Sequence, residues 1–195
     1  WNTVEALGSI SLAVVPNSLP ESEVAAIRKS IQSAADDYLR TAQEQGYAVP
    51  FSHIPGYPWG SNSFVLNNGM ILALAYDFTK NVAYLHGAAD ALHYILGRNA
   101  MDQSYVSGHG ANSLQNPHHR FWARQKSADF PPPFPGALSG GPNSALQDPV
   151  AAAKLKGCAP QKCFIDDVES YATNEVAINW NAPLAWLAAF LDGHE

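Results

Sequence analysis

The stretch SNSFVLNNGMILALAYDF, residues 61–78, predicts a long helix and decides the fold class. Apolar residues recur in it three and four positions apart, as they do on one face of an α-helix. The residues expected on this inward face are Val65, Leu66, Met70, Leu74 and Phe78. Because no part of the chain shows a sustained alternation of apolar and polar residues, the sequence predicts an all-α protein.

Helical patterns on both sides of this stretch extend the prediction. They cover residues 3–14, 17–39, 81–96 and, most strongly, 181–192. A capping box of Ser18 and Glu21 is expected to start the second helix, and Gly97 to end the fourth. The inward face of residues 81–96 is expected to consist of Val82, Leu85, Ala89, Leu92 and Leu96. Short connections predict antiparallel pairs, and the apolar, Ala-rich faces of about five helices indicate part of a larger helical assembly.

The bulk composition excludes some classes of partner. The chain has 195 residues, which fits one domain or part of one, and its formal net charge is −6. Charged residues make up only 14% of the chain and form no basic stripe, so nucleic acid is not an expected partner. No run of about 18 apolar residues occurs, so no membrane span is expected. The chain starts at Trp1 without a basic signal region, and we expect it to be the interior of a longer protein.

Residues 97–163 are rich in Pro and Gly and show little helical periodicity. A loop of this length in a compact domain is usually functional. Near its end lie Cys158 and Cys163, for which three states are open: a disulfide, two buried thiols, or half of a metal site. A disulfide would suit an extracellular protein.

Within this loop, residues 116–125 read NPHHRFWARQ and bring together two histidines, an arginine and a tryptophan. A metal site would need a third ligand, for which His109 could serve. Alternatively, one of the two histidines hydrogen-bonds the loop backbone. In a third interpretation, His118 and Arg120 donate hydrogen bonds to sugar hydroxyls, and Trp122 offers a flat apolar face to the ring.

Residues 164–183 combine four acids with aromatic and apolar neighbours. The acids are Asp166, Asp167, Glu169 and Glu175. Burial beside apolar residues raises the pKa of a carboxyl group, which suits a general acid near neutral pH. Capping of a helix N-terminus is the expected role of Asp166 or Asp167. Glu175, which precedes an apolar run, is the candidate for the acid.

Two segments together resemble the two signatures of glycoside hydrolase family nine, the cellulase family once called family E. The first consists of Ser104, Tyr105, Val106, Ser107, Gly110, Asn112 and Pro117-His118-His119-Arg120. The second consists of Phe164, Asp166, Tyr171, Glu175, Ala177 and Asn181-Ala182. WGSN at 59–62 and YILGRNAMDQSYVSG at 94–108 also resemble the family, so the resemblance covers essentially the whole chain.

The resemblance implies a fold and a set of roles. The family fold is an (α/α)6 barrel of twelve helices, of which this chain would form about the last five or six, with long loops as one wall of a cleft. Members hydrolyse β-1,4-glucosidic bonds, mostly in cellulose, with inversion. Glu175 matches the general acid, and His118 and Arg120 match a pair that contacts glucose. Asp166 is expected to orient the loop that contains Glu175.

Further residues of the expected site are aromatic. Trp59 resembles an aromatic sugar platform, and Trp122 lies beside the His-x-Arg pair. Trp180 stands where many members have Tyr, and it is expected to line the cleft near the acid. His119 is expected to be a structural neighbour, and no metal ligand is assigned in the site.

One element of the family is absent from the sequence. The general base of the family belongs to an Asp-Ala-Gly-Asp motif near the N-terminus of the domain, and residues 1–195 contain no such motif. We therefore expect residues 1–195 to be the C-terminal part of a single catalytic domain, without its N-terminal half, and to be inactive alone. Endoglucanase is the favoured activity, ahead of cellobiohydrolase or glucosidase. The alternative is a non-catalytic carbohydrate-binding remnant.

The resemblance also implies a secreted hydrolase whose partners are a β-1,4-glucan and the other half of its own domain. Catalysis would need no cofactor. Members commonly bind structural calcium, for which the loop acids Asp129 and Asp148 could serve. A small helical interaction module is a weaker alternative, because it leaves the acid-rich and histidine-rich loops unexplained.

Overall fold

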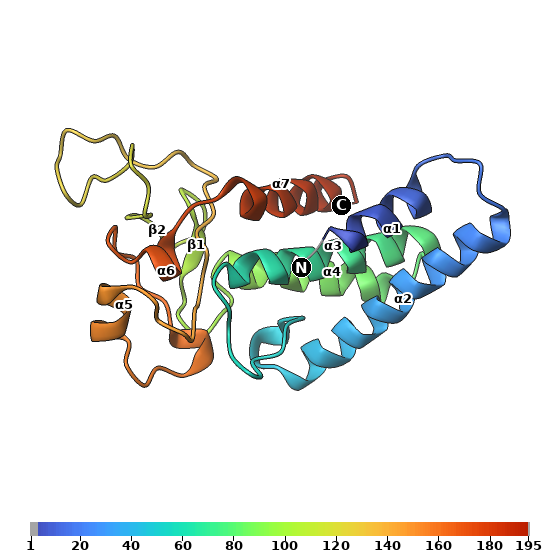
Figure 1. The fold of residues 1–195 in the computed structure, drawn as a ribbon, viewed down its shortest axis with the longest axis horizontal. Coiled ribbons are helices and arrows are strands. Elements are labelled where there is room, and N and C mark those ends of the chain that lie inside the picture. Colours follow the sequence, from blue (N-terminus) through green and yellow to red (C-terminus); the bar gives the residue numbers. More distant parts are fainter. Residues whose placement is uncertain (1–3, 195) are drawn as a thin grey trace.

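The computed structural model describes residues 4–194 and confirms the all-α class. Its long helices are α1 (Glu5–Val14), α2 (Glu21–Glu44), α3 (Ser61–Thr79), α4 (Val82–Ile95) and α7 (Ile178–Asp192). The short elements are α5 (Pro149–Lys154), α6 (Tyr171–Asn174), two 3-10 turns (Gly46–Ala48, Pro160–Lys162) and the parallel strands β1 (Ser104–Ser107) and β2 (Ser113–Leu114). The long helices lie along the molecule, and β1, β2, α5, α6 and the loops that connect them gather at one end (Figure 1). Thr3, which the first helix was expected to include, lies outside the described residues.

Helix α3 is the centre of the fold, because it packs against α2, α4 and α7. The expected inward residues Val65, Leu66 and Leu74 are buried, but Met70 and Phe78 are only half-buried. Buried residues on other sides of the helix include Asn68, Gly69, Ile71, Leu72, Ala73 and Ala75. A single inward face was therefore too narrow a prediction, since three helices surround α3 and bury most of its circumference.

The predicted inward face of α4 is only partly right, since Leu92 and Leu96 are half-buried and pack against the core. None of its five residues is fully buried, and Val82 is 57% exposed. The buried residues are instead Tyr84, Gly87, Ala88, Ala91, Tyr94 and Ile95. A Cβ atom at Gly87 would lie 2.7 Å from Leu39 Cδ2 and 3.3 Å from Leu72 Cδ1. Small residues let α4 approach α2 and α3 closely, and a prediction based on large apolar residues misses this kind of face.

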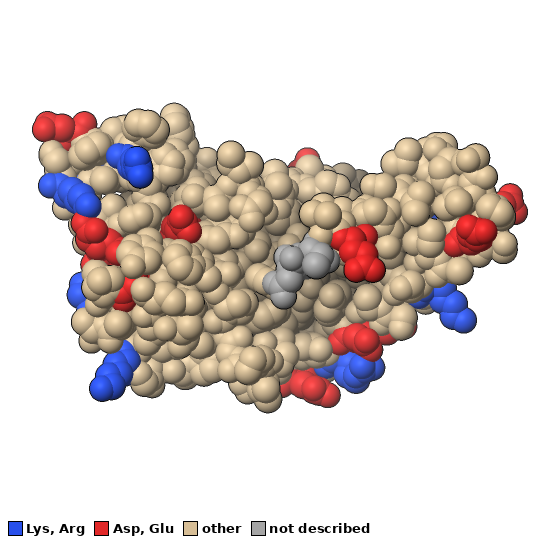
Figure 2. Space-filling model, viewed as in Figure 1, with Lys and Arg blue, Asp and Glu red and all other residues tan. Residues whose placement is uncertain are grey.

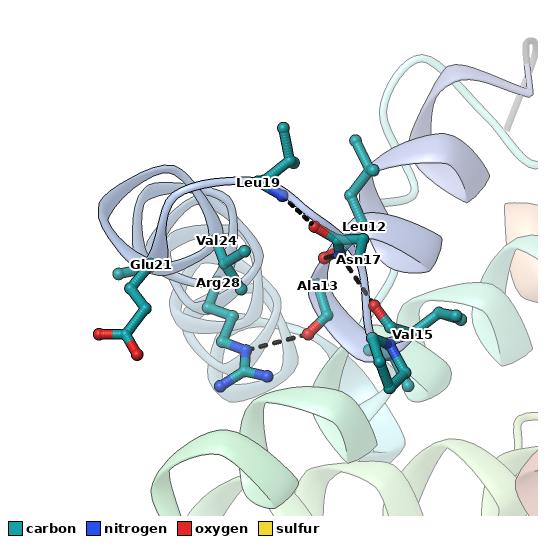
Figure 3. Close-up of a pocket in the computed structure, with 11 residues that line it drawn as sticks. Leu12, Ala13, Val15, Asn17, Leu19, Glu21, Val24 and Arg28 are labelled. Atoms are coloured by element: carbon teal, nitrogen blue, oxygen red, sulfur yellow. Dashed lines mark hydrogen bonds between the residues drawn. The ribbon is translucent and has the colours of Figure 1, made fainter.

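The turn between α1 and α2 does not contain the expected capping box. Helix α2 begins at Glu21 with Pro20 as N-cap, and no side chain caps it. Asn17 organises the turn instead: its Nδ2 donates to the carbonyls of Leu12 and Val15, and its Oδ1 accepts from Leu19 N–H (Figure 3). The side-chain amide thus pairs with carbonyl groups at the end of α1 and with an N–H group of the connection. Ser18 does not cap α2.

The connection after α4 starts at a glycine, as expected, and contains short strands and a short helix that were not predicted. The C-cap of α4 is Leu96, and Gly97 follows with a φ of +124°, as predicted for a helix-ending glycine. Elements β1, β2 and α5 were missed because each is too short to produce a periodic pattern. Cys158 and Cys163 form a disulfide, which decides between the three states left open.

The surface has few charges. On the face shown in Figure 2, acidic and basic side chains are sparse and lie mainly toward the two ends and one edge of the molecule. None of the helices within residues 4–194 is long and apolar enough to cross a membrane.

Candidate active site

The backbone at Glu175 joins segments that are distant in sequence. The N–H of His118 donates to the carbonyl of Asn174 at 2.8 Å, and the N–H of Gly140 donates to the carbonyl of Glu175 at 2.8 Å. A parallel β-bridge also pairs His118 with Glu175. The histidine-rich and acid-rich segments of the sequence therefore lie side by side in the structure.

Aromatic rings lie near the side chain of Glu175, a half-buried residue. Trp59 Nε1 donates to Glu175 Oε2 at 3.2 Å. The ring of Trp59 lies 5.8 Å from that of Tyr171, which in turn lies 5.8 Å from the ring of His118. We call Trp59, Tyr171 and His118 the aromatic row. Tyr171 was assigned no role from the sequence, although its position four residues before Glu175 could have indicated a shared face.

The ring of His118 is fixed by a backbone contact. Its Nδ1 lies 2.6 Å from the carbonyl oxygen of Val168. Because a carbonyl only accepts hydrogen bonds, Nδ1 has the proton, and in the neutral ring Nε2 is the acceptor. His118, the histidine expected to contact sugar, is therefore bonded to the backbone, and its second nitrogen is the one left for a ligand.

The neighbouring His119 has different partners. Its Nδ1 lies 3.3 Å from the N–H of Phe121, and its ring stacks on Trp122 at 3.9 Å. Burial and, second, the proximity of His118 lower the pKa of His119, which favours the neutral ring. His119 and Trp122 help to line a pocket that also includes Val176 and Ala177, the two residues after Glu175. Trp122 thus lies beside the site without a contact to the acid.

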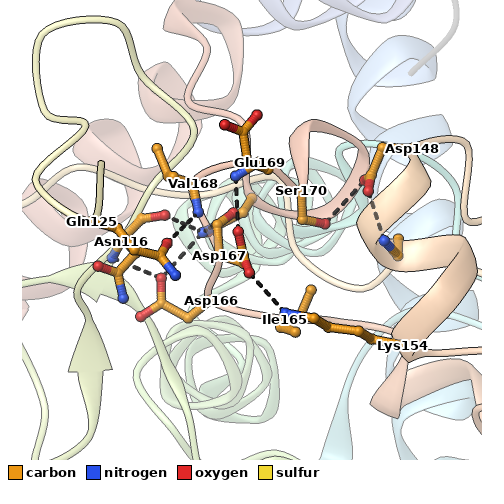
Figure 4. A network of polar contacts seen from close by, with 12 residues as sticks. Asn116, Gln125, Asp148, Lys154, Ile165, Asp166, Asp167, Val168, Glu169 and Ser170 are labelled. Atoms are coloured by element: carbon orange, nitrogen blue, oxygen red, sulfur yellow. Dashed lines mark hydrogen bonds and ion pairs between the residues drawn. The ribbon is translucent and has the colours of Figure 1, made fainter. Parts of the chain in front are cut away.

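Asp166 links the two loops that meet at Glu175 (Figure 4). Its carboxylate accepts from the backbone N–H of Gln115 at 2.8 Å and of Asn116 at 2.7 Å. Asn174 Nδ2 donates to Asp166 Oδ1 at 3.1 Å and to the carbonyl of Asn116 at 2.6 Å. These contacts are those of a supporting residue that holds loops together.

The predicted helix N-cap at Asp166 or Asp167 is wrong for both residues. The N-cap of α6 is Ser170, without a side-chain hydrogen bond. Asp167 accepts from Glu169 N–H at 3.0 Å and forms an ion pair with Lys154 at 3.0 Å. Burial opposes ionisation of Asp167, but the Glu169 N–H and Lys154 outweigh it and lower its pKa. The sequence predicted a raised pKa for acids in this segment, whereas the pKa of Asp167 is lowered.

Asp148 has the capping role instead. This fully buried residue is the N-cap of α5, and its Oδ1 accepts from Ala151 N–H at 2.6 Å. Its Oδ2 accepts from Ser170 Oγ at 3.0 Å and from Ala172 N–H at 2.9 Å. Because hydrogen-bond donors occupy both oxygens, Asp148 does not fit the calcium role considered for it. The Asp148-Pro149 pair was a local signal for the missed α5.

The remaining candidates differ in environment. Arg120 is exposed, and Asp129 is an exposed loop residue whose carboxylate accepts from Ser127 Oγ at 3.2 Å. Trp180 is half-buried: a Cβ atom at Gly60 would lie 2.7 Å from its indole, and one at Gly140 would lie 2.9 Å away. Within residues 4–194, no cluster of three or more His, Cys, Asp or Glu side chains is arranged to hold a metal ion.

Glu175 thus lies beside the aromatic row, on loops at one end of the packed helices. The chain belongs to glycosyl hydrolase family 9, whose family model matches residues 1–188. The family expectation is therefore confirmed.

Two curated relatives show how much of a longer protein the chain matches. The cellulose 1,4-beta-cellobiosidase of Acetivibrio thermocellus is 51% identical over 197 residues, which cover 98% of this chain and 22% of that protein. Endoglucanase C of Cellulomonas fimi is 40% identical over 195 residues, which cover 98% of this chain and 18% of that protein. The chain spans about a fifth of the length of these two relatives.

Solved structures agree with the fold. The family 9 endoglucanase J30 superposes with a TM-score of 0.85 at 33% identity, covering 95% of this chain and 34% of that one. The Bacteroides ovatus GH9 structure superposes with a TM-score of 0.81 at 34% identity, covering 97% of this chain and 32% of that one. The helices described above correspond to part of an (α/α)6 barrel, as expected.

Proposed function

We propose that this chain forms the acid-bearing part of the active site of an inverting β-1,4-glucanase. The substrate class is cellulose or cello-oligosaccharides, and endoglucanase action is the favoured mode. The observation that supports this proposal most strongly is the position of Glu175. The carbonyl of Glu175 accepts from Gly140 N–H, the carbonyl of Asn174 accepts from His118 N–H, and the carboxyl group of Glu175 lies against Trp59.

The proposed reaction needs two carboxyl groups and one water molecule. Glu175 gives its proton to the glycosidic oxygen as the bond from C1 to that oxygen breaks. Water attacks C1 from the opposite face and gives its proton to a carboxylate base. In inverting enzymes the two carboxyl groups are about 6.5–9.5 Å apart, which leaves room for this water. We propose that the base lies on a segment outside residues 1–195, because the Asp-Ala-Gly-Asp motif is absent from them.

The neighbouring side chains suit a neutral sugar. His118 Nε2 and the exposed Arg120 are the proposed hydrogen-bonding groups, and Trp59 and Trp122 are the proposed apolar contacts. Trp180 is half-buried, and its sugar contact stays a prediction. A sparsely charged surface is compatible with a neutral glucan (Figure 2). The mechanism uses no cofactor.

Secretion is part of the proposal. The bond between Cys158 and Cys163 favours an oxidising compartment, where such disulfides persist. An insoluble or polymeric glucan substrate would also have to be met outside the cell.

The decisive test is Glu175→Gln in the complete enzyme, by which we mean a protein that contains residues 1–195 and the base-bearing segment. Hydrolysis of cello-oligosaccharides should fall at least about a thousandfold, while their binding, measured by calorimetry, is retained, because the amide cannot donate an acidic proton. Glu169→Gln is the matched control, since Glu169 is exposed and pairs with Lys126. Near-normal turnover of the Glu175 variant would refute the assignment.

Residues 1–195 alone provide a second test. We expect them to bind cello-oligosaccharides without hydrolysing them, because the base is missing. Measurable hydrolysis by this chain, with inversion seen by NMR of the first product, would show that the base lies within it. If the complete enzyme is also inactive although its base motif is present, the carbohydrate-binding alternative replaces the enzymatic one.

A further inference from the structure

We propose that Trp59 is a positioning residue that selects which oxygen of Glu175 holds the transferred proton. The inference rests on the proposed role of Glu175 as the general acid. An indole N–H can only donate a hydrogen bond, so the oxygen that it contacts must be an acceptor. Trp59 Nε1 contacts Oε2 at 3.2 Å. The carbonyl oxygen of a protonated carboxyl group is a better acceptor than its hydroxyl oxygen, so the contact favours the form in which Oε2 is the carbonyl oxygen and the proton resides on Oε1.

This selection matters because only one orientation of the acid is productive. A general acid must place its proton within hydrogen-bond reach of the leaving oxygen. Without the indole donor, the proton could reside on either oxygen and the carboxyl group could rotate. The contact from Trp59 disfavours both alternatives before substrate binds, and it stays compatible with the ionised acid after the proton has left.

The backbone around Trp59 is connected to the same segment that holds Glu175. Asn62 N–H donates to the carbonyl of Gly140 at 3.0 Å, and Ser61 Oγ donates to the carbonyl of Pro142 at 2.7 Å. Gly140 N–H in turn donates to the carbonyl of Glu175 at 2.8 Å. Residues 139–142 are thus a common support for the indole donor and for the acid, which keeps the distance between them constant.

Packing fixes the loop further. Gly60 follows Trp59 with a φ of +77°, a left-handed conformation that favours glycine. The indole of Trp180 occupies the space that a Cβ atom at Gly60 would need. The ring of Trp59 lies beside Tyr171 at 5.8 Å, with 32° between the ring planes. The side chain is 36% exposed, so it is accessible to a substrate while its N–H is used internally.

Trp59 is also a proposed apolar contact for sugar, and the competing interpretation is that this platform is its whole role. A platform binds the ring face of a sugar and affects the affinity for all substrates alike. A positioning donor affects only the proton transfer. The need for that transfer depends on the leaving group, because the benefit of acid catalysis falls as the leaving group becomes less basic.

The experiment compares two substrates of the complete enzyme: cellotetraose, whose leaving group needs protonation, and dinitrophenyl β-cellobioside, whose leaving group departs without it. Trp59→Phe removes the N–H. Replacement of Trp59 by 3-benzothienylalanine keeps the bicyclic shape and removes only the donor. For both variants we expect kcat on cellotetraose to fall about tenfold or more, since the acid loses a charge-assisted hydrogen bond. For the benzothienylalanine variant, which keeps the apolar face, KM and the rate on the dinitrophenyl substrate should change less than about twofold. Trp186→Phe, on the exposed side of α7, is the matched control.

Each other outcome overturns the inference. Equal losses on both substrates, or a rise in KM alone, would identify a platform or a structural role. Unchanged kinetics of the benzothienylalanine variant would show that the N–H is not used, even if Trp59→Phe fails to fold. Glu175→Gln is measured on the same two substrates. If it shows no selective loss on cellotetraose, the proposed function fails; if it does while the Trp59 variants do not, only the inference fails.

Discussion

Asn174 Nδ2 donates to Asp166 Oδ1 at 3.1 Å, and this contact ties the residue before Glu175 to the carboxylate that holds the histidine-rich loop. The same carboxylate accepts from the backbone N–H groups of Gln115 and Asn116. The acid and the proposed sugar-binding loop therefore share one anchor.

Asp166→Asn should weaken both stability and activity. Asparagine has one acceptor oxygen where aspartate has two, so one of the two backbone N–H groups loses its partner. We expect the free energy of unfolding to fall by about 1–3 kcal/mol and kcat/KM of the complete enzyme to fall about tenfold. Urea unfolding and cello-oligosaccharide kinetics measure these effects. Asp37→Asn, on the exposed side of α2, is the control, and equal values for the two variants would contradict the anchoring role.

Gly140→Ala should displace the segment that holds the backbone of Glu175. The added methyl group would lie 2.9 Å from Trp180 Cζ3, closer than two carbon atoms approach without a shift. We expect a loss of about 1–3 kcal/mol in the free energy of unfolding, as for other overpacked sites, together with reduced kcat. Gly46→Ala is the matched control, because nothing lies within 4 Å of its Cβ position. Wild-type kinetics for Gly140→Ala would show that this segment does not position the acid.

The ion pair of Asp167 predicts a pH dependence. The pKa of this carboxyl group in the folded chain is below its ordinary value of 3.8, so the unfolded chain binds a proton first as the pH falls. Its stabilising contribution is therefore present above the unfolded pKa and is lost as the pH falls through the folded pKa. The difference in unfolding free energy between wild type and Asp167→Asn should be constant from about pH 7 to pH 5 and shrink below about pH 4. A difference that stays constant down to about pH 2 would contradict this prediction.

The disulfide should stabilise the chain. It joins residues five positions apart, and closing so short a loop is expected to contribute about 2 kcal/mol. Cys158→Ser with Cys163→Ala should therefore lower the thermal midpoint, and the alanine avoids placing a hydroxyl group at the buried position 163. A reducing agent should lower the midpoint of the wild type to a similar value and leave the variant unchanged. A wild-type midpoint that is insensitive to reduction would rule out this contribution.

Much of the helical framework could be predicted from local patterns. Helix α3 runs from Ser61 to Thr79, close to the predicted 61–78, because its apolar periodicity is long and uninterrupted. The buried face of α4 could not be predicted, since Gly87, Ala88 and Ala91 are buried for close packing rather than for their hydrophobicity. The wrong capping predictions at Ser18, Asp166 and Asp167 have a related cause. A polar side chain near a helix start is available to any nearby donor, and tertiary contacts decide which donor it meets.

The candidate site likewise contains residues that the sequence suggests and contacts that only the structure reveals. Residue types and the resemblance to the family singled out Glu175, His118, Arg120 and Asp166 as candidates, because each belongs to a short segment, and their roles in catalysis stay predictions. Tyr171 was not assigned a role, and the true contact of Trp59 could not be foreseen, because that contact joins residues 116 positions apart.

The sequence by itself determined the all-α class, most helix bounds, the family and the candidate acid. These follow from hydrogen bonds and periodicities within a few residues, or from short signatures. Only the tertiary structure decided that Trp59, Gly140 and Asp166 converge on the segment around Glu175. A hydrogen bond between distant residues depends on how whole helices and loops pack, and no local pattern encodes that geometry.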